Sequence, residues 1–136
     1  KKLLKGKLLS YLSSTNSLWI DGGHEELSAI ALNNWLNKNK NRKIYLIFGM
    51  LNTKNPRDFL KHFTNTVTCV KTISIPNQEN SADPKLLAKI SNELGIKSNV
   101  CTSIQDAIRE CSNENENSLV LITGSLYLMG EVLNCN

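Results

Sequence analysis

The sequence predicts an α/β domain of the Rossmann-like type, with a mostly parallel sheet and helices on both of its faces. Short apolar runs alternate along the chain with amphipathic stretches, which is typical of β-α units that build a parallel sheet. Three runs, residues 17–21, 43–48 and 118–123, are apolar almost throughout instead of at every second position. Strands with this pattern are buried on both faces, so helices are expected on either side of the sheet.

Two further strands are expected between these runs. Residues 66–75 form a longer, β-branched stretch whose alternation is looser, which favours a position nearer an edge of the sheet. Residues 98–100 are expected to add a brief strand.

Amphipathic helices are expected to connect the strands. Residues 25–39 carry apolar side chains at near-helical spacing, with acids in the first turn and lysines at the end, as the helix dipole favours. The stripe expected to face the core consists of Leu27, Ile30, Ala31, Asn34 and Leu36.

Capping residues mark the other helices. Pro56 begins a short helix that extends to residue 63, and Asp83-Pro84 begins one that Gly95 ends. Ser103 begins a third through a capping-box-like S-I-Q-D start. The stripe expected to face the core in this helix consists of Ile104, Ala107, Ile108 and Cys111.

One domain is expected, because a chain of 136 residues buries enough surface for a core of its own. Residues 17–136 are assigned to this domain. Residues 1–16 show no clear partner within the chain and are interpreted as an interdomain linker or an incoming segment.

Composition argues against several classes of partner. The formal net charge of +4 is modest, and lysine is dense only in residues 1–7 and 38–43, so no nucleic-acid partner is expected. Lysines interrupt the only leader-like stretch, residues 3–12, and no apolar run reaches the roughly 18–20 residues of a membrane span. A cytoplasmic protein without a membrane partner is therefore expected. The four cysteines form no C-x-x-C pair and no zinc-ligand spacing with histidine, so they are interpreted as reduced thiols and no metal ligands are assigned.

Ligands of open parallel sheets gather beyond the carboxyl ends of the strands, which points to three segments. These are residues 21–25, 49–55 and 124–128, each directly after an apolar run. In the first segment, two glycines allow a sharp turn and close approach of a ligand. Asp21 could accept there from a ribose or an ammonium group, and His24 could donate to a phosphate. On local grounds alone, Asp21 could equally cap the following helix, with His24 on the surface.

The two later segments offer a cation and a hydroxyl group. The ammonium of Lys54, on a loop before a helix, could meet a carboxylate or a phosphate, although a loop lysine is commonly solvated. The Ser125 hydroxyl and neighbouring amides could hold an anion at a helix N-terminus, or Ser125 could simply cap that helix. The sequence contains no G-x-x-x-x-G-K-[ST] phosphate loop, no G-x-G-x-x-G and no G-x-S-x-G elbow. The chain by itself therefore shows no device for gripping a triphosphate or a dinucleotide.

Taken in order, the three segments resemble the carboxy-terminal domain of the dihydrofolate synthase/folylpolyglutamate synthase family, a branch of the Mur ligase superfamily. That family shows D-G-A-H-N-P, G-M-L-x-D-K-D and T-G-S-L-Y-L-V-G-E after its first, second and last strands. Here residues 21–24 read D-G-G-H, residues 49–51 read G-M-L, and residues 123–131 read T-G-S-L-Y-L-M-G-E. The resemblance covers nearly the whole chain from about Gly6 onward.

The sequence departs from the family pattern beside these matches. Glu25 and Glu26 stand in place of Asn-Pro. Thr53 and Asn55 stand in place of the two acids of D-K-D. Lys7 stands where relatives have the linker arginine that reaches the nucleotide.

The resemblance implies one part of an ATP-dependent ligase. In such enzymes ATP phosphorylates a pteroate or folate carboxylate, and the amine of L-glutamate attacks the acyl phosphate to form an amide. By analogy, Ser125 and Lys54 would hold the carboxylates of glutamate through charge-assisted hydrogen bonds. His24, against glutamate or phosphate, and Asp21 are the catalytic candidates. Asp21, near the ribose, and Lys7 are the candidates for contact with ATP.

The resemblance also implies partners. ATP and magnesium would be held mainly by an amino-terminal ATPase domain of the same enzyme, which would also carry the pocket for the folate-type substrate. The carboxy-terminal domain would supply the glutamate side. The chain alone is then expected to be inactive. Two alternatives stay open: a decayed or repurposed non-catalytic remnant that serves as an interaction or small-anion binding module, and an unrelated Rossmann-like module.

Overall fold

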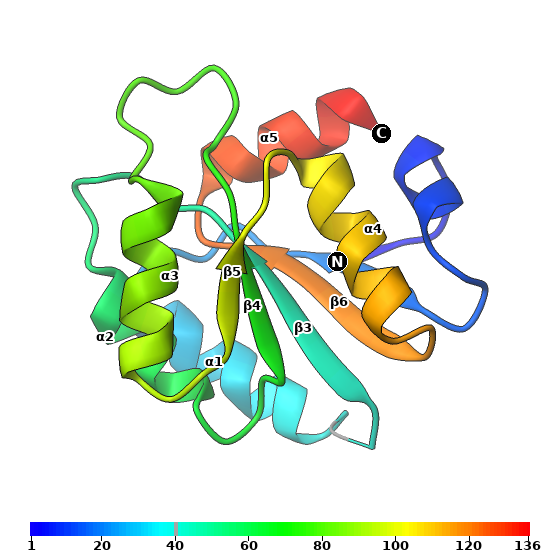
Figure 1. Cartoon of the computed structure of the whole chain (residues 1–136), viewed down its shortest axis with the longest axis horizontal. Coiled ribbons are helices and arrows are strands. Elements are labelled where there is room, and N and C mark those ends of the chain that lie inside the picture. The colour runs from blue at the N-terminus through cyan, green and yellow to red at the C-terminus, as the bar shows by residue number, and fades with distance from the viewer. Residues whose placement is uncertain (40) are drawn as a thin grey trace.

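The computed structural model describes residues 1–39 and 41–136, which form one sheet between two layers of helices (Figure 1). The six strands have the order β1-β2-β6-β3-β4-β5. Only β1 is antiparallel to its neighbour, and all other pairs are parallel. The mostly parallel α/β sheet predicted from the sequence is therefore confirmed. The strands are β1 (Lys2–Leu3), β2 (Ser17–Ile20), β3 (Lys43–Phe48), β4 (Cys69–Thr72), β5 (Ser98–Val100) and β6 (Ser118–Thr123).

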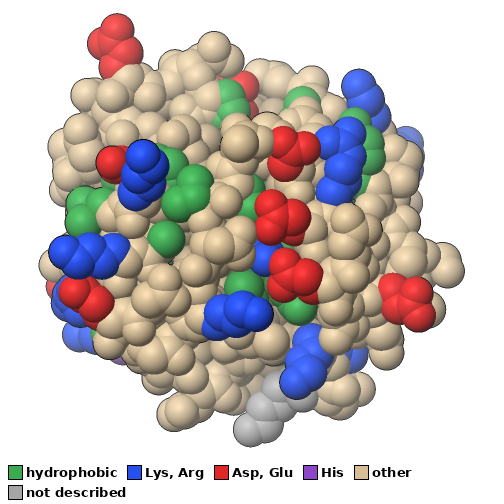
Figure 2. Space-filling view, viewed as in Figure 1, with side chains coloured by type: hydrophobic (Ala, Val, Ile, Leu, Met, Phe, Trp, Pro, Cys, Tyr) green, Lys and Arg blue, Asp and Glu red, His purple; other side chains and the backbone are tan. Residues whose placement is uncertain are grey.

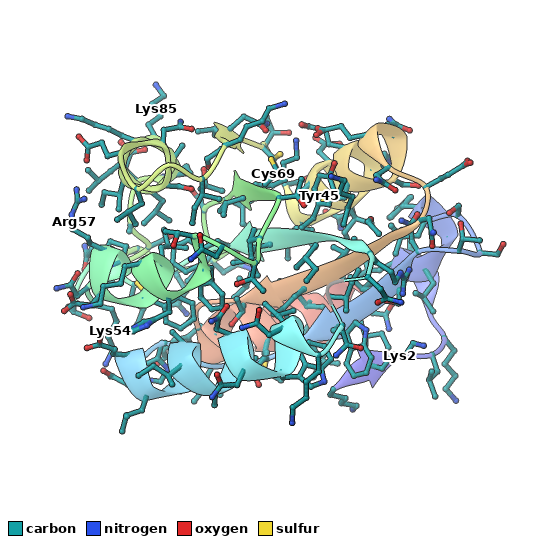
Figure 3. The ribbon with its side chains drawn as sticks, turned by 90° about the horizontal axis from the view of Figure 1, so that it is seen from below. Lys2, Tyr45, Lys54, Arg57, Cys69 and Lys85 are labelled. Carbon is teal, nitrogen blue, oxygen red and sulfur yellow. The ribbon has the colours of Figure 1, made fainter. Side chains whose placement is uncertain are left out.

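Helices cover both faces of the sheet, as predicted. One apolar cluster joins the sheet to three helices, and a second joins the opposite face to two helices and a 3-10 helix. Figure 3 shows α1 and α4 on opposite sides of the sheet. The first face carries α1 (Glu26–Asn37), α2 (Pro56–Leu60) and α3 (Pro84–Glu93). A short 3-10 helix, η2 (Lys61–Phe63), follows α2 on this face. The second face carries η1 (Lys7–Tyr11), α4 (Ile104–Glu114) and α5 (Leu126–Cys135).

The central strand β6 shows why its sequence is apolar throughout. All six of its residues are buried. Leu119 and Leu121 belong to the cluster beneath α1, α2 and α3, whereas Val120 and Ile122 belong to the cluster beneath α4 and α5. Because successive side chains of a strand point to opposite faces, a strand covered on both sides needs apolar residues at every position.

The predicted capping residues begin and end the helices. The side chains of Asn55 and Ser103 accept the backbone N–H groups of residues three positions later, and Asp83 accepts from Lys85. These bonds satisfy N–H groups that have no partner within the helix. After α3, Gly95 adopts a φ of +87°, the left-handed conformation expected of a residue that ends a helix.

The predicted inner face of α1 is wrong except at Leu36, because the other four residues of the predicted stripe are exposed. Leu27 is 79% exposed and Ile30 is 39% exposed, whereas Ala29 and Leu36 are fully buried. Ala29 and Leu36 are separated by two helical turns, and Leu27 lies about 200° around the helix from Ala29, because each residue advances about 100°. The stripe predicted for α4 is correct, since Ile104, Ala107, Ile108 and Cys111 are all buried.

The strand predicted at residues 66–75 is shorter than expected and, as predicted, lies near an edge of the sheet. Only Cys69–Thr72 is a strand, and all four residues are buried. The brief strand predicted at residues 98–100 is also present, and it pairs with the outer side of β4 and forms the edge of the sheet.

Residues 1–16, for which the sequence indicated no partner, pack against the rest of the chain. β1 pairs with β2, and the backbone N–H of Lys7 donates to the carbonyl of Asn136 at 3.0 Å. Leu8 is fully buried in the cluster beneath α4 and α5. That this segment also links the chain to a preceding domain stays a prediction.

The surface carries charges of both signs. Figure 2 shows acidic and basic side chains mixed over the face that it displays. None of the helices in the part of the chain that the structure describes is long and apolar enough to cross a membrane.

Candidate functional site

The ends of three neighbouring strands place the predicted segments side by side. Ile20 of β2 is level with Ile122 of β6, and Phe48 of β3 is level with Thr123 of β6. The three segments that follow therefore begin at one edge of the sheet, where they enclose a pocket of about 80 Å³. The pocket is lined by His24, Leu51, Lys54, Gly124, Ser125, Leu126 and Tyr127.

Close backbone contact between β3 and β6 fixes the floor of this pocket. Gly124 has a φ of +121°, and a Cβ atom there would lie 2.1 Å from the carbonyl oxygen of Gly49. Only glycine satisfies both conditions, because it has no Cβ and tolerates positive φ. Gly124 thereby directs the chain from β6 into α5 and positions Ser125 at the pocket.

Asp21 and two glycines form the turn after β2. The Asp21 Oδ2 atom accepts the backbone N–H of Gly23 at 2.8 Å. A Cβ atom on Gly22 would lie 2.4 Å from Leu126 Cδ2, so the first turn of α5 packs directly on this glycine. The alternative that Asp21 caps the following helix is wrong, because α1 has Glu25 at its N-cap position.

His24 is held at the mouth of the pocket by its own turn. Its Nδ1 atom lies 3.2 Å from the carbonyl oxygen of Gly22. A carbonyl oxygen can only accept, so this contact is a hydrogen bond in the tautomer that has its proton on Nδ1. The Nε2 atom lies 3.5 Å from Oε1 of Glu25, and the side chain is 30% exposed.

Lys54 reaches the same mouth from the loop after β3. Its Nζ atom donates to Oε1 of Glu25 at 2.9 Å, and its backbone N–H donates to the carbonyl of Leu51 at 3.1 Å. Figure 3 shows Lys54 beside the first turn of α1, far from Lys2. The hydrogen bond and the positive charge of Lys54 lower the pKa of Glu25 below its ordinary value.

Ser125 lines the pocket and is 3% exposed. Its Oγ atom accepts the backbone N–H of Tyr127 at 3.0 Å, so Ser125 is the N-cap of α5. This bond uses a lone pair of the hydroxyl oxygen, and the hydroxyl proton is left for an acceptor in the pocket. The capping role and the binding role considered from the sequence are therefore compatible.

The structure brings together three of the five predicted site residues. His24, Lys54 and Ser125 share the pocket, whereas Asp21 lines a different hollow and Lys7 begins η1. The hollow at Asp21 has a volume of about 240 Å³ and includes the edge-to-face pair Trp19 and Trp35. Leu51, Leu126 and Tyr127 were not singled out from the sequence, although each lies in a segment that directly follows a strand.

A second group of charges lies between β4 and α4 and lines no part of this pocket. Lys71 is 1% exposed, and its Nζ atom donates to Asn99 at 2.8 Å and contacts the carboxylates of Glu110 and Glu114. Burial favours a neutral Lys71, but the hydrogen bond and charge of Glu114 outweigh burial and raise the pKa of Lys71. Burial also opposes ionisation of Glu110, yet hydrogen bonds from Cys101 and Asn99 lower its pKa. This arrangement satisfies a buried ammonium group and has the features of a structural ion pair.

Within residues 1–39 and 41–136, no group of three or more His, Cys, Asp or Glu side chains is placed to hold a metal ion.

Fold and site together define a Rossmann-like α/β domain with a small pocket at the carboxyl ends of its parallel strands, where open parallel sheets bind their ligands. The family model described as "Dihydrofolate synthetase, C-terminal domain" matches residues 7–135, and the chain belongs to this family. The resemblance inferred from the three strand-end motifs is thereby confirmed.

Solved structures of folylpolyglutamate synthases share the fold. The enzyme of Mycobacterium tuberculosis complexed with ADP matches with a TM-score of 0.76 and 18% identity, covering 87% of this chain and 29% of that one. Escherichia coli FolC in complex with DHPP and ADP matches with a TM-score of 0.74 and 19% identity, over 91% of this chain and 29% of that one. The bifunctional folylpolyglutamate synthase/dihydrofolate synthase of Yersinia pestis with Mn, AMPPNP and L-glutamate bound matches with a TM-score of 0.75 and 20% identity. This match covers 90% of this chain and 29% of that one. The chain thus spans less than a third of the length of these proteins, and comparison with curated sequences gives no match.

Proposed function

We propose that this chain is the glutamate-positioning carboxy-terminal domain of an ATP-dependent dihydrofolate synthase/folylpolyglutamate synthase. The enzyme would join a pteroate or folate carboxylate to the amine of L-glutamate through an acyl phosphate. The observation that carries the proposal is the convergence of His24, Lys54 and Ser125 in one pocket. The Yersinia pestis structure of the same fold, which has L-glutamate bound, supports it.

The pocket offers what a dicarboxylate ligand requires. The Ser125 hydroxyl and the Lys54 ammonium can each donate to a carboxylate oxygen, and bonds to a charged acceptor are about twice as strong as neutral ones. His24 faces the mouth, where the amine or the acyl phosphate would approach. None of these groups acts as a nucleophile, so the domain would contribute by positioning the amine and stabilising charge.

ATP and magnesium belong in this proposal to an amino-terminal ATPase part. Asp21 and Lys7 remain proposed contacts to ATP from this chain, with Asp21 beside the tryptophan-lined hollow. Residues 1–16 would connect the parts, since Lys1 lies next to the carbonyl of Ile20 at the same edge of the sheet as the pocket. A cytoplasmic location and a folate-type substrate are part of the same proposal.

The test is to fuse the chain to the amino-terminal part of a family member whose folding is verified by ADP binding. Amide formation that depends on ATP, magnesium and L-glutamate is expected from the fusion and not from the chain alone. Ser125→Ala should raise the KM for L-glutamate about tenfold or more, because a hydrogen bond to a charged group contributes about 1.5–3 kcal/mol.

Ser103→Ala is the matched control, because Ser103 caps α4 as Ser125 caps α5 but lies outside the pocket. Its KM for L-glutamate should stay within about twofold of the parent value, well below the change that loss of a charge-assisted bond produces. A well-folded fusion without turnover, or an equal effect of both substitutions, would contradict the proposed function. A non-catalytic remnant predicts the first of these results.

A further inference from the structure

Glu25 contacts the two residues at the mouth of the pocket that could meet an anionic ligand. Its Oε1 atom accepts from Nζ of Lys54 at 2.9 Å and lies 3.5 Å from Nε2 of His24. A single carboxylate oxygen of the chain itself therefore occupies the position between the ammonium group and the imidazole ring.

The contact is not required to build the helix that Glu25 begins. Glu25 has the extended backbone of an N-cap residue, but its side chain accepts no N–H group of α1. The side chain turns instead toward the loop after β3. The neighbouring Glu26 behaves differently, because its carboxylate pairs with Lys61 at 3.0 Å and His62 at 2.8 Å, neither of which lines the pocket.

We propose that Glu25 is a built-in competitor of the substrate carboxylate, which must displace it from Lys54 before the ligand is fully bound. The inference rests on the proposed function, since it assumes that Lys54 receives a carboxylate of L-glutamate. The side chain of Glu25 ends in the same group as the side chain of that ligand. It is thus an intramolecular mimic of the ligand, held at a high effective concentration.

The ion pair is suited to exchange. The Glu25 side chain is 62% exposed and that of Lys54 is 32% exposed, and pairs with this degree of exposure are weak. Lys54 also lowers the pKa of Glu25, so the competing carboxylate is ionised throughout the neutral range. Competition would therefore weaken glutamate binding without abolishing it, and would disfavour anions that make no other contact in the pocket.

The experiment is a titration of the chain with L-glutamate at low ionic strength, followed by two-dimensional NMR. Glu25→Gln should bind L-glutamate about five- to tenfold more tightly than the parent chain, because it removes the exposed ion pair that competes for Lys54. Glu26→Gln is the matched control, since it changes the net charge equally one residue away, and its affinity should stay within about twofold of the parent. In a Lys54→Gln chain, Glu25→Gln should no longer tighten binding.

The outcomes separate this inference from the proposed function. Equal affinities of the parent chain and Glu25→Gln, with binding lost in Ser125→Ala, would overturn the competition and leave the glutamate site standing. Weaker binding by Glu25→Gln would also overturn it, because Glu25 would then attract the ammonium group of the ligand. A chain that binds no L-glutamate in any variant would refute the glutamate site itself.

Discussion

Replacing Gly124 by alanine should strongly destabilise the domain. A non-glycine residue in a sparsely populated backbone conformation costs about 1–3 kcal/mol, and Gly124 has a φ of +121°. The new Cβ atom would also lie 2.1 Å from the Gly49 carbonyl oxygen, which forces β3 and β6 apart. Overpacking of this kind costs about 1–3 kcal/mol more, so the expected total is about 4 kcal/mol. That loss is a large part of the roughly 5–15 kcal/mol by which a domain is stable.

Two other glycines separate the contributions of backbone conformation and contact. Gly95 has a φ of +87° with no atom within 4 Å of an added Cβ, so Gly95→Ala should cost only the strain of about 1–2 kcal/mol. Gly130 lies within α5 with equally open space, and Gly130→Ala should stabilise by about 0.5–1 kcal/mol. Urea unfolding followed by the fluorescence of Trp19 and Trp35 gives all three values. A Gly124→Ala chain within about 1 kcal/mol of the parent, well short of the predicted strain, would refute the reasoning.

Two further predictions concern the face of the sheet beneath α4. The free energy of unfolding should fall as the pH drops through the lowered pKa of Glu110, because a carboxylate with a depressed folded pKa stabilises only while ionised. Urea unfolding at a series of pH values measures this decrease, and Lys71→Met should make it smaller. An equal decrease of the unfolding free energy at acid pH in both chains would count against the ion pair with Lys71. In the native chain, iodoacetamide should label Cys135 well before Cys111, since Cys135 is only partly buried and Cys111 is fully buried with a pKa raised by that burial. Peptide mass spectrometry after timed labelling measures this order, and equal rates would contradict the packing of α4.

The parts of the fold that depend on local pattern could be predicted from the sequence. Ser103 and the apolar stripe of α4 lie within one element, so their spacing alone indicates the cap and the buried face. The face of α1 could not be predicted in this way, because Leu27 and Ala29 are both plausible core residues and only the position of the helix on the sheet decides between them. The strand at residues 98–100 was predicted, but its pairing with β4 was not. That pairing is a contact between two elements, and the length of a strand does not reveal its neighbours.

The site shows the same division. Convergence of His24, Lys54 and Ser125 follows from strand order, because carboxyl ends of parallel strands meet at one edge. The direction of the Asp21 side chain depends on the turn itself, in which the carboxylate bends back to the N–H of Gly23. The pair between Lys54 and Glu25 joins residues 29 positions apart on different elements, so no local spacing indicates it.

The glycines in the motifs that identify the family are therefore required mainly by the path of the backbone. Gly22 is required by the first turn of α5, and Gly124 is required by the carbonyl of Gly49, whatever the pocket binds. These glycines would keep their places in an active ligase domain and in a remnant that only folds. The side chains of His24 and Lys54 are not required for packing in this way. Both are partly exposed, and they contact Glu25 and the carbonyl of Gly22 at the pocket mouth. Substituting either one should leave stability nearly unchanged and weaken L-glutamate binding, and this separation of folding from binding distinguishes a working ligase domain from an inherited fold.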